Sequence, residues 1–331
     1  MMDEIAFDWV RSGSVKHAGR RRQFRWAGVG AVFAGMTIMA SMANAEAPSR
    51  WVKDDRVGAI NEITPATVKD AGRLIKTGKV YSLAIDTKPD PTLFRVYRVT
   101  LRASEPRGTN QLTSIEDLVI ASPSIGTSLD GLSHVGRGGV HYNGVRIGDI
   151  MGSDGGFKGA KVLGTEAIPP IVARGVLLDF VRYGDRAALT GQAGISRAHI
   201  EAVAKAEAVD IRRGDVVLLH TGWLQNEANR PAPSGVPSVP GLGTDGARYL
   251  ASLGVVAVGA DTPGVEVNPS EVPSEFLPVH QILLVDNGVY IVENVKTEEL
   301  AADSAYEFMF VLATPKLLGT VQSTITPVAI R

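Results

Sequence analysis

The feature that most constrains this fold is a set of short apolar runs in the second half of the chain. "GVLLDFVRYG" and "GDVVLLHTGW" are bounded by glycines, and "LGVVAVGAD" follows a helix-like segment. Runs of this kind are typical of strands that are buried on both faces, as in a parallel sheet that is covered by helices. The pattern therefore predicts an α/β protein.

Helix-like segments alternate with these strands. "TPATVKDAGRLIKTG" opens with the helix-starting pair Thr64-Pro65 and ends in Gly78, and "SRAHIEAVAKAEAV" and "TDGARYLASL" have helical spacing. "KVYSLAI" and "YRVTLRA" alternate as strands do, and "HQILLVDNGVYIVENV" reads as two short elements around an Asn-Gly turn. No break in composition divides the chain, so we predict one α/β domain over residues 46–331.

Residues 1–45 have the organisation of an export signal. An arginine cluster precedes the uncharged stretch Trp26–Ala45, which ends in the small-x-small site Ala43-Asn44-Ala45. The pair Arg21-Arg22 resembles a twin-arginine signal, so we predict cleavage after Ala45 and a periplasmic or secreted protein. An ordinary secretory signal and an uncleaved anchor are the alternatives, because twenty uncharged residues can just span a bilayer. The cleavage motif argues against the anchor, and no stable membrane insertion is expected after cleavage.

Composition excludes several classes of function. The chain has no cysteine, which rules out thiolate metal sites, a cysteine nucleophile and disulfides. The net charge is −1, and it falls to −4 without the signal segment, which holds six Lys or Arg and three Asp or Glu. No basic cluster remains to bind phosphates, so no nucleic-acid partner is expected. Any metal must be held by His, Asp and Glu, which favours zinc or manganese.

Imidazole and carboxylate side chains in and near loops are the candidate functional residues. Two pairs stand out: Asp130 with His134, and His280 with Glu293. A histidine–carboxylate mixture is the ligand set of a catalytic zinc or manganese site that keeps a position open for water. Spacing alone also permits two separate ion pairs. Further pocket candidates, in glycine-rich loops or at strand ends, are Ser124, Ser128, His141, His220 and Asp261.

Several segments in order resemble the metal-dependent cyclase or hydrolase family that includes bacterial kynurenine formamidase and isatin hydrolase. They are "DRVGAINEITPATV", "GDVVLLHTGW", "GLGTDGARYLASLGVVAVGADTPGVE" and "PVHQILLVDNGVYIVENV". "GTSLDGLSHVGRGGVHYNG" corresponds to the signature His-x-Gly-Thr-His-x-Asp-x-x-x-His. The resemblance runs from about Asp55 to the C-terminus and implies a swivelling β/β/α fold, assembled as a homodimer or homotetramer.

The resemblance also implies roles for individual residues. Asp130 becomes a carboxylate metal ligand, His280 and Glu293 complete the ligand group, and His134 becomes the catalytic acid or base, with Glu293 as a second candidate for that duty. The two other signature histidines align with Ser124 and Ser128, and a neutral hydroxyl is a poor metal ligand. Three ligands still remain, which is the usual number for a catalytic zinc.

The function implied is the hydrolysis of an amide, formamide, cyclic imide or lactone in a small carbonyl substrate, with a divalent ion as cofactor. Two alternatives stay open. One is an exported pseudoenzyme that binds a small carbonyl compound, which the two serines favour. The other is metal-free catalysis of a cyclisation or elimination by His134 and a carboxylate.

Overall fold

A computed structural model describes residues 50–89, 95–183, 189–190, 193–226 and 238–331. Residues 45–331 form one compact unit. The predicted signal segment lies outside the described residues. Within the described ranges, no helix is both long enough and apolar enough to cross a membrane.

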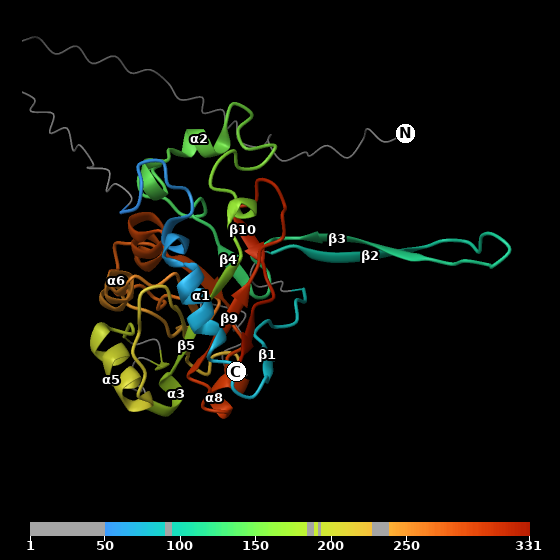
Figure 1. Cartoon of the computed structure of the whole chain (residues 1–331). Helices are drawn as coiled ribbons and strands as arrows, with labels where there is room; N and C mark the ends of the chain where they lie inside the picture. The colour runs from blue at the N-terminus through green and yellow to red at the C-terminus, as the bar shows by residue number, and fades with distance from the viewer. Residues whose placement is uncertain (1–49, 90–94, 184–188, 191–192, 227–237) are drawn as a thin grey trace, which may run out of the picture. The chain divides into compact units, whose positions relative to one another are not determined.

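A nine-stranded mixed sheet forms the centre of this unit, in the order β1-β11-β9-β5-β6-β7-β8-β4-β10. Its strands are β1 (Val80–Ser82), β4 (Ser128–Asp130), β5 (Ile171–Asp179), β6 (Val216–His220), β7 (Ala257–Ala260), β8 (Tyr290–Glu293), β9 (Glu307–Leu312), β10 (Gln322–Thr324) and β11 (Val328–Ile330). The four central strands β5 to β8 are parallel, and the outer strands pair antiparallel. Two further strands, β2 (Tyr97–Ala103) and β3 (Ile115–Ala121), form a separate ribbon that extends away from the sheet (Figure 1).

Helices complete the α/β architecture that the sequence predicts. They are α1 (Pro65–Gly72), α2 (Ile147–Met151), α3 (Phe180–Tyr183), α5 (Arg197–Glu207), α6 (Thr244–Leu253), α7 (Pro278–His280) and α8 (Glu298–Ala302). Short 3-10 turns are η1 (Gly58–Glu62), η2 (Tyr142–Gly144) and η3 (Thr165–Ala167), and a π-helical segment, η5, spans Gln281–Asp286. Every residue of β6, β7 and β8 is buried, which explains their continuous apolar sequences. The prediction of a single α/β domain is confirmed.

Two predicted boundaries are wrong, for local reasons. The first helix ends at Gly72 rather than Gly78, because glycine disfavours the helix and tight turns follow it, such as Leu74 N–H to the Ala71 carbonyl at 3.0 Å. The run "GVLLDFVRYG" is not one strand. Asp179 Oδ1 accepts a 3.0 Å hydrogen bond from the Arg182 N–H, so this carboxylate ends β5 and caps the short helix α3.

Candidate metal centre

Strand β4 carries the first candidate ligand, Asp130. Alternate residues of a strand project from the same face, so Ser128 and Asp130 face the site while Leu129 packs on the other side. Gln322 on β10, directly opposite in the sheet, donates a 2.7 Å hydrogen bond to Asp130 Oδ1. The other oxygen, Oδ2, is buried and has no hydrogen-bond partner among the described residues. A buried carboxylate oxygen without a donor is the kind of atom that a cation satisfies.

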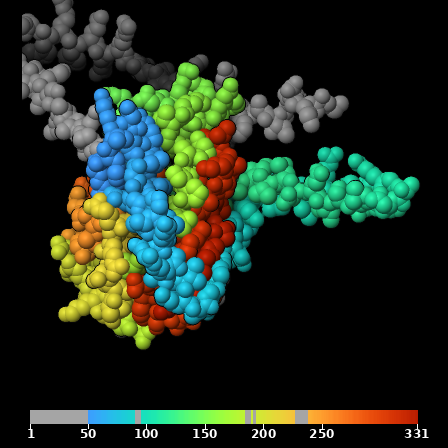
Figure 2. Space-filling view, viewed as in Figure 1, coloured from blue at the N-terminus to red at the C-terminus, as the bar shows by residue number. Residues whose placement is uncertain are grey.

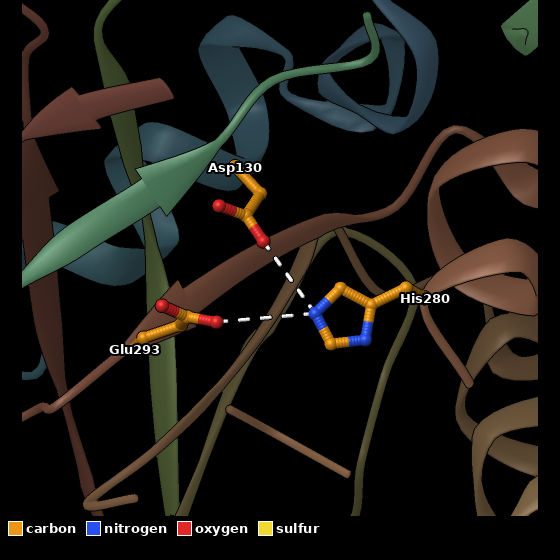
Figure 3. Close-up of side chains that lie close together, drawn as sticks. All are labelled: Asp130, His280 and Glu293. Atoms are coloured by element: carbon orange, nitrogen blue, oxygen red, sulfur yellow. Dashed lines mark ion pairs between the residues drawn. The ribbon is translucent and has the colours of Figure 1, made fainter. Parts of the chain in front are cut away.

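His280 lies at the end of α7 and presents one ring nitrogen to this carboxylate. Its Nδ1 donates to Glu266 Oε2 at 2.7 Å, and its backbone N–H donates to the same oxygen at 3.0 Å. The opposite nitrogen, Nε2, lies 3.6 Å from Asp130 Oδ2 and 3.8 Å from Glu293 Oε1 (Figure 3). Glu266 thus fixes the ring so that Nε2 points between two carboxylates.

Glu293 ends strand β8 and joins the cluster through strand pairing. The β4–β8 register places Ser128 opposite Glu293, and the Ser128 hydroxyl donates to Glu293 Oε2 at 3.3 Å. The Arg95 guanidinium lies 4.0 Å from the same oxygen and also donates to the backbone carbonyl of Ser124. One oxygen of Glu293 is therefore engaged by neighbouring side chains, while Oε1 faces His280.

The residues Asp130, His280 and Glu293 fit a divalent ion. One ligand atom from each lies within 4.8 Å of the other two, and all three side chains are buried. Two carboxylate oxygens and one imidazole nitrogen are a donor set that zinc and manganese accept. Asp130 Oδ2, which has no hydrogen-bond donor among the described residues, and the oriented His280 Nε2 both point into this space.

The negative charge of the cluster changes the protonation of its members. Burial, together with the charge of Glu293, raises the pKa of Asp130 to about 6. Burial by itself lowers the pKa of His280, but the hydrogen bond to Glu266 and the carboxylates of Glu293 and Asp130 outweigh it and raise that pKa to about 10. An ion that binds at Nε2 must therefore displace a proton.

Comparison with known proteins decides the family. The cyclase family model, described as "Putative cyclase", matches residues 46–267. The chain belongs to the cyclase family. The crystal structure of a novel cyclase is 31% identical, with a TM-score of 0.75, over 86% of this chain and 98% of that chain. No curated protein matches the sequence.

More distant structures share the fold of this chain. An isatin hydrolase bound to the product analogue thioisatinate is 18% identical, with a TM-score of 0.54, over 81% of this chain and 98% of that chain. Isatin hydrolase A from Labrenzia aggregata, bound to benzyl benzoate, is 19% identical, with a TM-score of 0.52, over 76% of this chain and 93% of that chain. The predicted family resemblance is confirmed.

His134 lies beside Asp130, one of the three candidate ligands. It follows β4 in a turn that its own N–H closes onto the Gly131 carbonyl at 3.0 Å, and its Nε2 lies 4.0 Å from Asp130 Oδ2. Only glycine fits at position 131 of this turn, because a Cβ there would lie 2.9 Å from the Val321 carbonyl oxygen. Burial lowers the pKa of His134, so the ring is neutral at neutral pH.

The other pocket candidates divide into two groups. Ser124 and Ser128 lie at the cluster, where the carbonyl of Ser124 accepts from Arg95 and the hydroxyl of Ser128 donates to Glu293, and His141 is buried in the loop that follows His134. His220 and Asp261 instead lie together at the ends of β6 and β7, with 3.5 Å between Nδ1 and Oδ2. Asp261 accepts hydrogen bonds from the backbone of Thr221 and Gly222, and so anchors the loop after β6.

Among the described residues, no hydrogen bond or ion pair joins His220 or Asp261 to the three candidate ligands. A pocket role for these two residues stays a prediction.

Three residues of the site were not predicted from the sequence: Glu266, Gln322 and Arg95. Glu266 follows "GADTPG" in an irregular segment, and Gln322 and Arg95 belong to segments that no motif distinguishes. A ligand histidine almost always donates its second ring nitrogen to a carboxylate, a backbone carbonyl or water. That rule predicts a hydrogen-bond partner for His280. The structure identifies this partner as Glu266.

Proposed function

We propose that this cyclase is a metal-dependent hydrolase that cleaves a C–N or C–O bond in an amide, formamide, cyclic imide or lactone. The observation that carries the proposal is the convergence of Asp130, His280 and Glu293 on one space, with His134 4.0 Å from Asp130. When bound there, zinc or manganese supplies a Lewis acid that polarises a carbonyl and makes water more acidic. The isatin hydrolases of the same fold carry a hydrolytic reaction in their names.

His134 is the residue that moves the proton. Because burial lowers its pKa, the ring is an unprotonated base at neutral pH and accepts a proton from the attacking water. The water oxygen forms a bond to the carbonyl carbon, the C–N or C–O bond breaks, and His134 returns the proton to the leaving nitrogen or oxygen. The neighbouring Asp130 carboxylate stabilises the imidazolium that forms between these two steps.

Ser124 and Ser128 stand where the family signature has histidines. Ser128 is fully buried and hydrogen-bonded to Glu293, and the carbonyl of Ser124 holds Arg95 beside the same carboxylate. The positive charge that Arg95 brings next to Glu293 offsets part of the negative charge of the cluster. We infer that the site holds one ion rather than two.

A binding protein without turnover is the second candidate. His280 as an imidazolium lies among Asp130, Glu266 and Glu293, so its own positive charge partly balances the carboxylates without an ion. This candidate predicts that wild type and His134→Ala are equally inactive on every substrate of the proposed classes.

We also propose that the cyclase acts in the periplasm or outside the cell, on the strength of the arginine pair and the Ala43-Asn44-Ala45 site. N-terminal sequencing of the exported form should begin at Glu46. A membrane-bound form that still carries Trp26 would contradict the proposal.

Turnover of aryl formamides, cyclic imides and lactones by the metal-loaded mature protein tests the function. Wild type should hydrolyse at least one class, and His134→Ala should lose about 10²–10⁴-fold in kcat while keeping its metal. His199→Ala, a change to a partly exposed histidine on α5, is the control and should keep full activity. Loss of the bound metal in His134→Ala would show that this histidine is a ligand instead.

A further inference from the structure

Arg95 lies at the base of the ribbon that β2 and β3 form. It precedes β2 by two residues, and Ser124 follows β3 by three residues. The Ser122 N–H donates to the Val96 carbonyl at 2.8 Å, and the Val96 N–H donates to the Ser122 hydroxyl at 3.0 Å. Figure 2 shows the ribbon standing clear of the body of the protein, so its base is where the two meet. The pairing of Val96 with Ser122 therefore fixes the backbone next to Arg95.

The guanidinium of Arg95 is only partly engaged by the protein. Its Nη1 donates to the Ser124 carbonyl, and its Nη2 lies 4.0 Å from Glu293 Oε2, which is too far for a hydrogen bond. A guanidinium has five N–H donors. Within the described part of the chain, the hydrogen bond to Ser124 is the one that this guanidinium makes. Most of its donors therefore remain for a ligand.

Solvent reaches Arg95 and His134, whereas the candidate metal ligands are enclosed. The side chains of Arg95 and His134 are 22% and 27% exposed. No more than 6% of any candidate ligand's side chain is exposed: Asp130, His280 and Glu293. Burial and, to a smaller extent, the charges of His280 and Arg95 lower the pKa of His134. A small molecule that approaches the ligands can therefore contact both the base and the cation.

Arg95 also changes the balance of charge at the site. Three carboxylates surround the His280 ring, those of Asp130, Glu266 and Glu293. When a divalent ion is bound and the ring is neutral, the ion balances two of these charges and Arg95 balances the third. Without Arg95, the remaining negative charge would repel an anion. The loaded site can therefore accept an anionic group.

Guanidinium and carboxylate groups match in shape as well as in charge. Two parallel N–H groups of a guanidinium bind both oxygens of a carboxylate, and such hydrogen bonds are about twice as strong as neutral ones. Arginine keeps its charge throughout the pH range in which enzymes work. Arg95 lies 4.0 Å from an oxygen of the candidate ligand Glu293, so it can reach a carboxylate that is only a few bonds from a carbonyl at the ion.

We propose that the substrate of this cyclase carries a carboxylate close to the scissile carbonyl, and that Arg95 binds this carboxylate. The inference rests on the proposed hydrolytic function and names the class of substrate within it: an anionic amide, formamide, cyclic imide or lactone. The scissile carbonyl lies beside His134, and the carboxylate lies against the remaining donors of Arg95. Arg95 thus determines specificity and takes no part in proton transfer.

Isothermal titration of the metal-loaded mature protein with benzoate and with benzamide tests the binding without turnover. Wild type should bind benzoate at least about 10-fold more tightly than benzamide, because charge-assisted hydrogen bonds replace neutral ones. Arg95→Gln should lose at least about 10-fold in benzoate affinity. Arg95→Lys should keep part of that affinity, since lysine retains the charge without the paired donors. Arg98→Gln, a change to an exposed arginine in β2, is the matched control and should bind benzoate as wild type does.

A carboxylate that the ion alone holds gives a different result. Arg95→Gln would then bind benzoate as tightly as wild type, or more tightly, and the proposal would be wrong. Benzamide that binds wild type as tightly as benzoate does would also overturn it.

Turnover of 3-formamidobenzoate and of its neutral isostere 3-formamidobenzamide gives the second measurement. Arg95→Gln should raise KM for the anionic compound at least about 10-fold with kcat nearly unchanged, and should change neither constant for the neutral one. An equal fall in kcat on both compounds would show that Arg95 acts on the reacting carbonyl, and would overturn the proposal. A wild type that binds benzoate through Arg95 but turns over none of the proposed classes would support the recognition of carboxylates and contradict hydrolysis.

Discussion

Glu266 Oε2 accepts two hydrogen bonds from His280, at 2.7 Å from the ring Nδ1 and at 3.0 Å from the backbone N–H. The two residues are fourteen positions apart, and the contact fixes both the position and the orientation of the imidazole. The side of the ring that faces Asp130 and Glu293 is therefore set by a residue that lies outside the ligand group.

Replacing Glu266 tests this relationship. Glu266→Gln removes the charge that favours Nδ1 as a donor, and we expect the affinity for zinc or manganese to fall about 10–100-fold. Glu275→Gln, a change to an exposed glutamate of the same segment, is the matched control and should leave the affinity unchanged. Isothermal titration of each variant measures the difference, and equal affinity in both would contradict the role of Glu266.

The pH dependence of ion binding follows from the protonation of the free site. The pKa of His280 is raised to about 10 and that of Asp130 to about 6, whereas the ion requires a neutral Nε2 and a charged carboxylate. Affinity should therefore rise with pH, about 10-fold per unit between pH 7 and 9, and more steeply below pH 6, where Asp130 also takes up a proton.

Calorimetric titration with Mn²⁺ in buffers of different ionisation enthalpy measures this proton release. We expect about one proton per bound ion at pH 7.5. Binding that releases no proton would show that Nε2 of His280 is not a ligand.

Arg95 should weaken the binding of the ion, because both carry positive charge. Its guanidinium lies 4.0 Å from Glu293 Oε2, and its charge lowers the pKa of His134. Arg95→Gln should therefore tighten ion binding and shift the acid limb of the activity profile to higher pH. Arg146→Gln, a change to an exposed arginine, should do neither. Weaker ion binding in Arg95→Gln would indicate that Arg95 orients Glu293 instead.

The two serines define a gain-of-function experiment. Imidazole is a far better ligand than a hydroxyl, so Ser124→His/Ser128→His should add a second ion or tighten the first. Ser128 Oγ is already within 3.3 Å of Glu293, so a ligand at this position adjoins the existing group. Metal content of the purified double variant, measured by mass spectrometry, gives the result. The control is Thr113→His/Ser114→His, two exposed residues in the loop that joins β2 and β3.

Much of the fold follows from local sequence. The continuous apolar runs before His220 in β6 and throughout β7 predict buried parallel strands, because a strand that is buried on both faces has no polar face, and every residue of both strands is buried. Less predictable are the features that depend on distant pairing. Strand β5 begins at Ile171 because its first half pairs with β9, more than a hundred residues later. The strand β3 was missed because its charged and apolar residues match no buried pattern.

The same division holds for the candidate site. Spacing alone permits two separate ion pairs, one of Asp130 with His134 and one of His280 with Glu293. The antiparallel β4–β8 ladder joins them into one group, since it places Ser128 opposite Glu293 and Asp130 two residues along the same face. The sequence thus predicts the candidate ligands, whereas the pairing of β4 with β8 brings them into one site.

Equilibrium dialysis of the mature protein against zinc or manganese, with Asp130→Asn alongside, tests the central claim most directly. The Oδ2 of Asp130 has no protein donor among the described residues and lies 3.6 Å from His280 Nε2, so its charge should be required for the ion. We predict one ion per wild-type chain at micromolar concentration, and an affinity at least about 10-fold weaker in Asp130→Asn. A wild type that binds no ion at that concentration, or an Asp130→Asn variant that binds as tightly, would contradict the account.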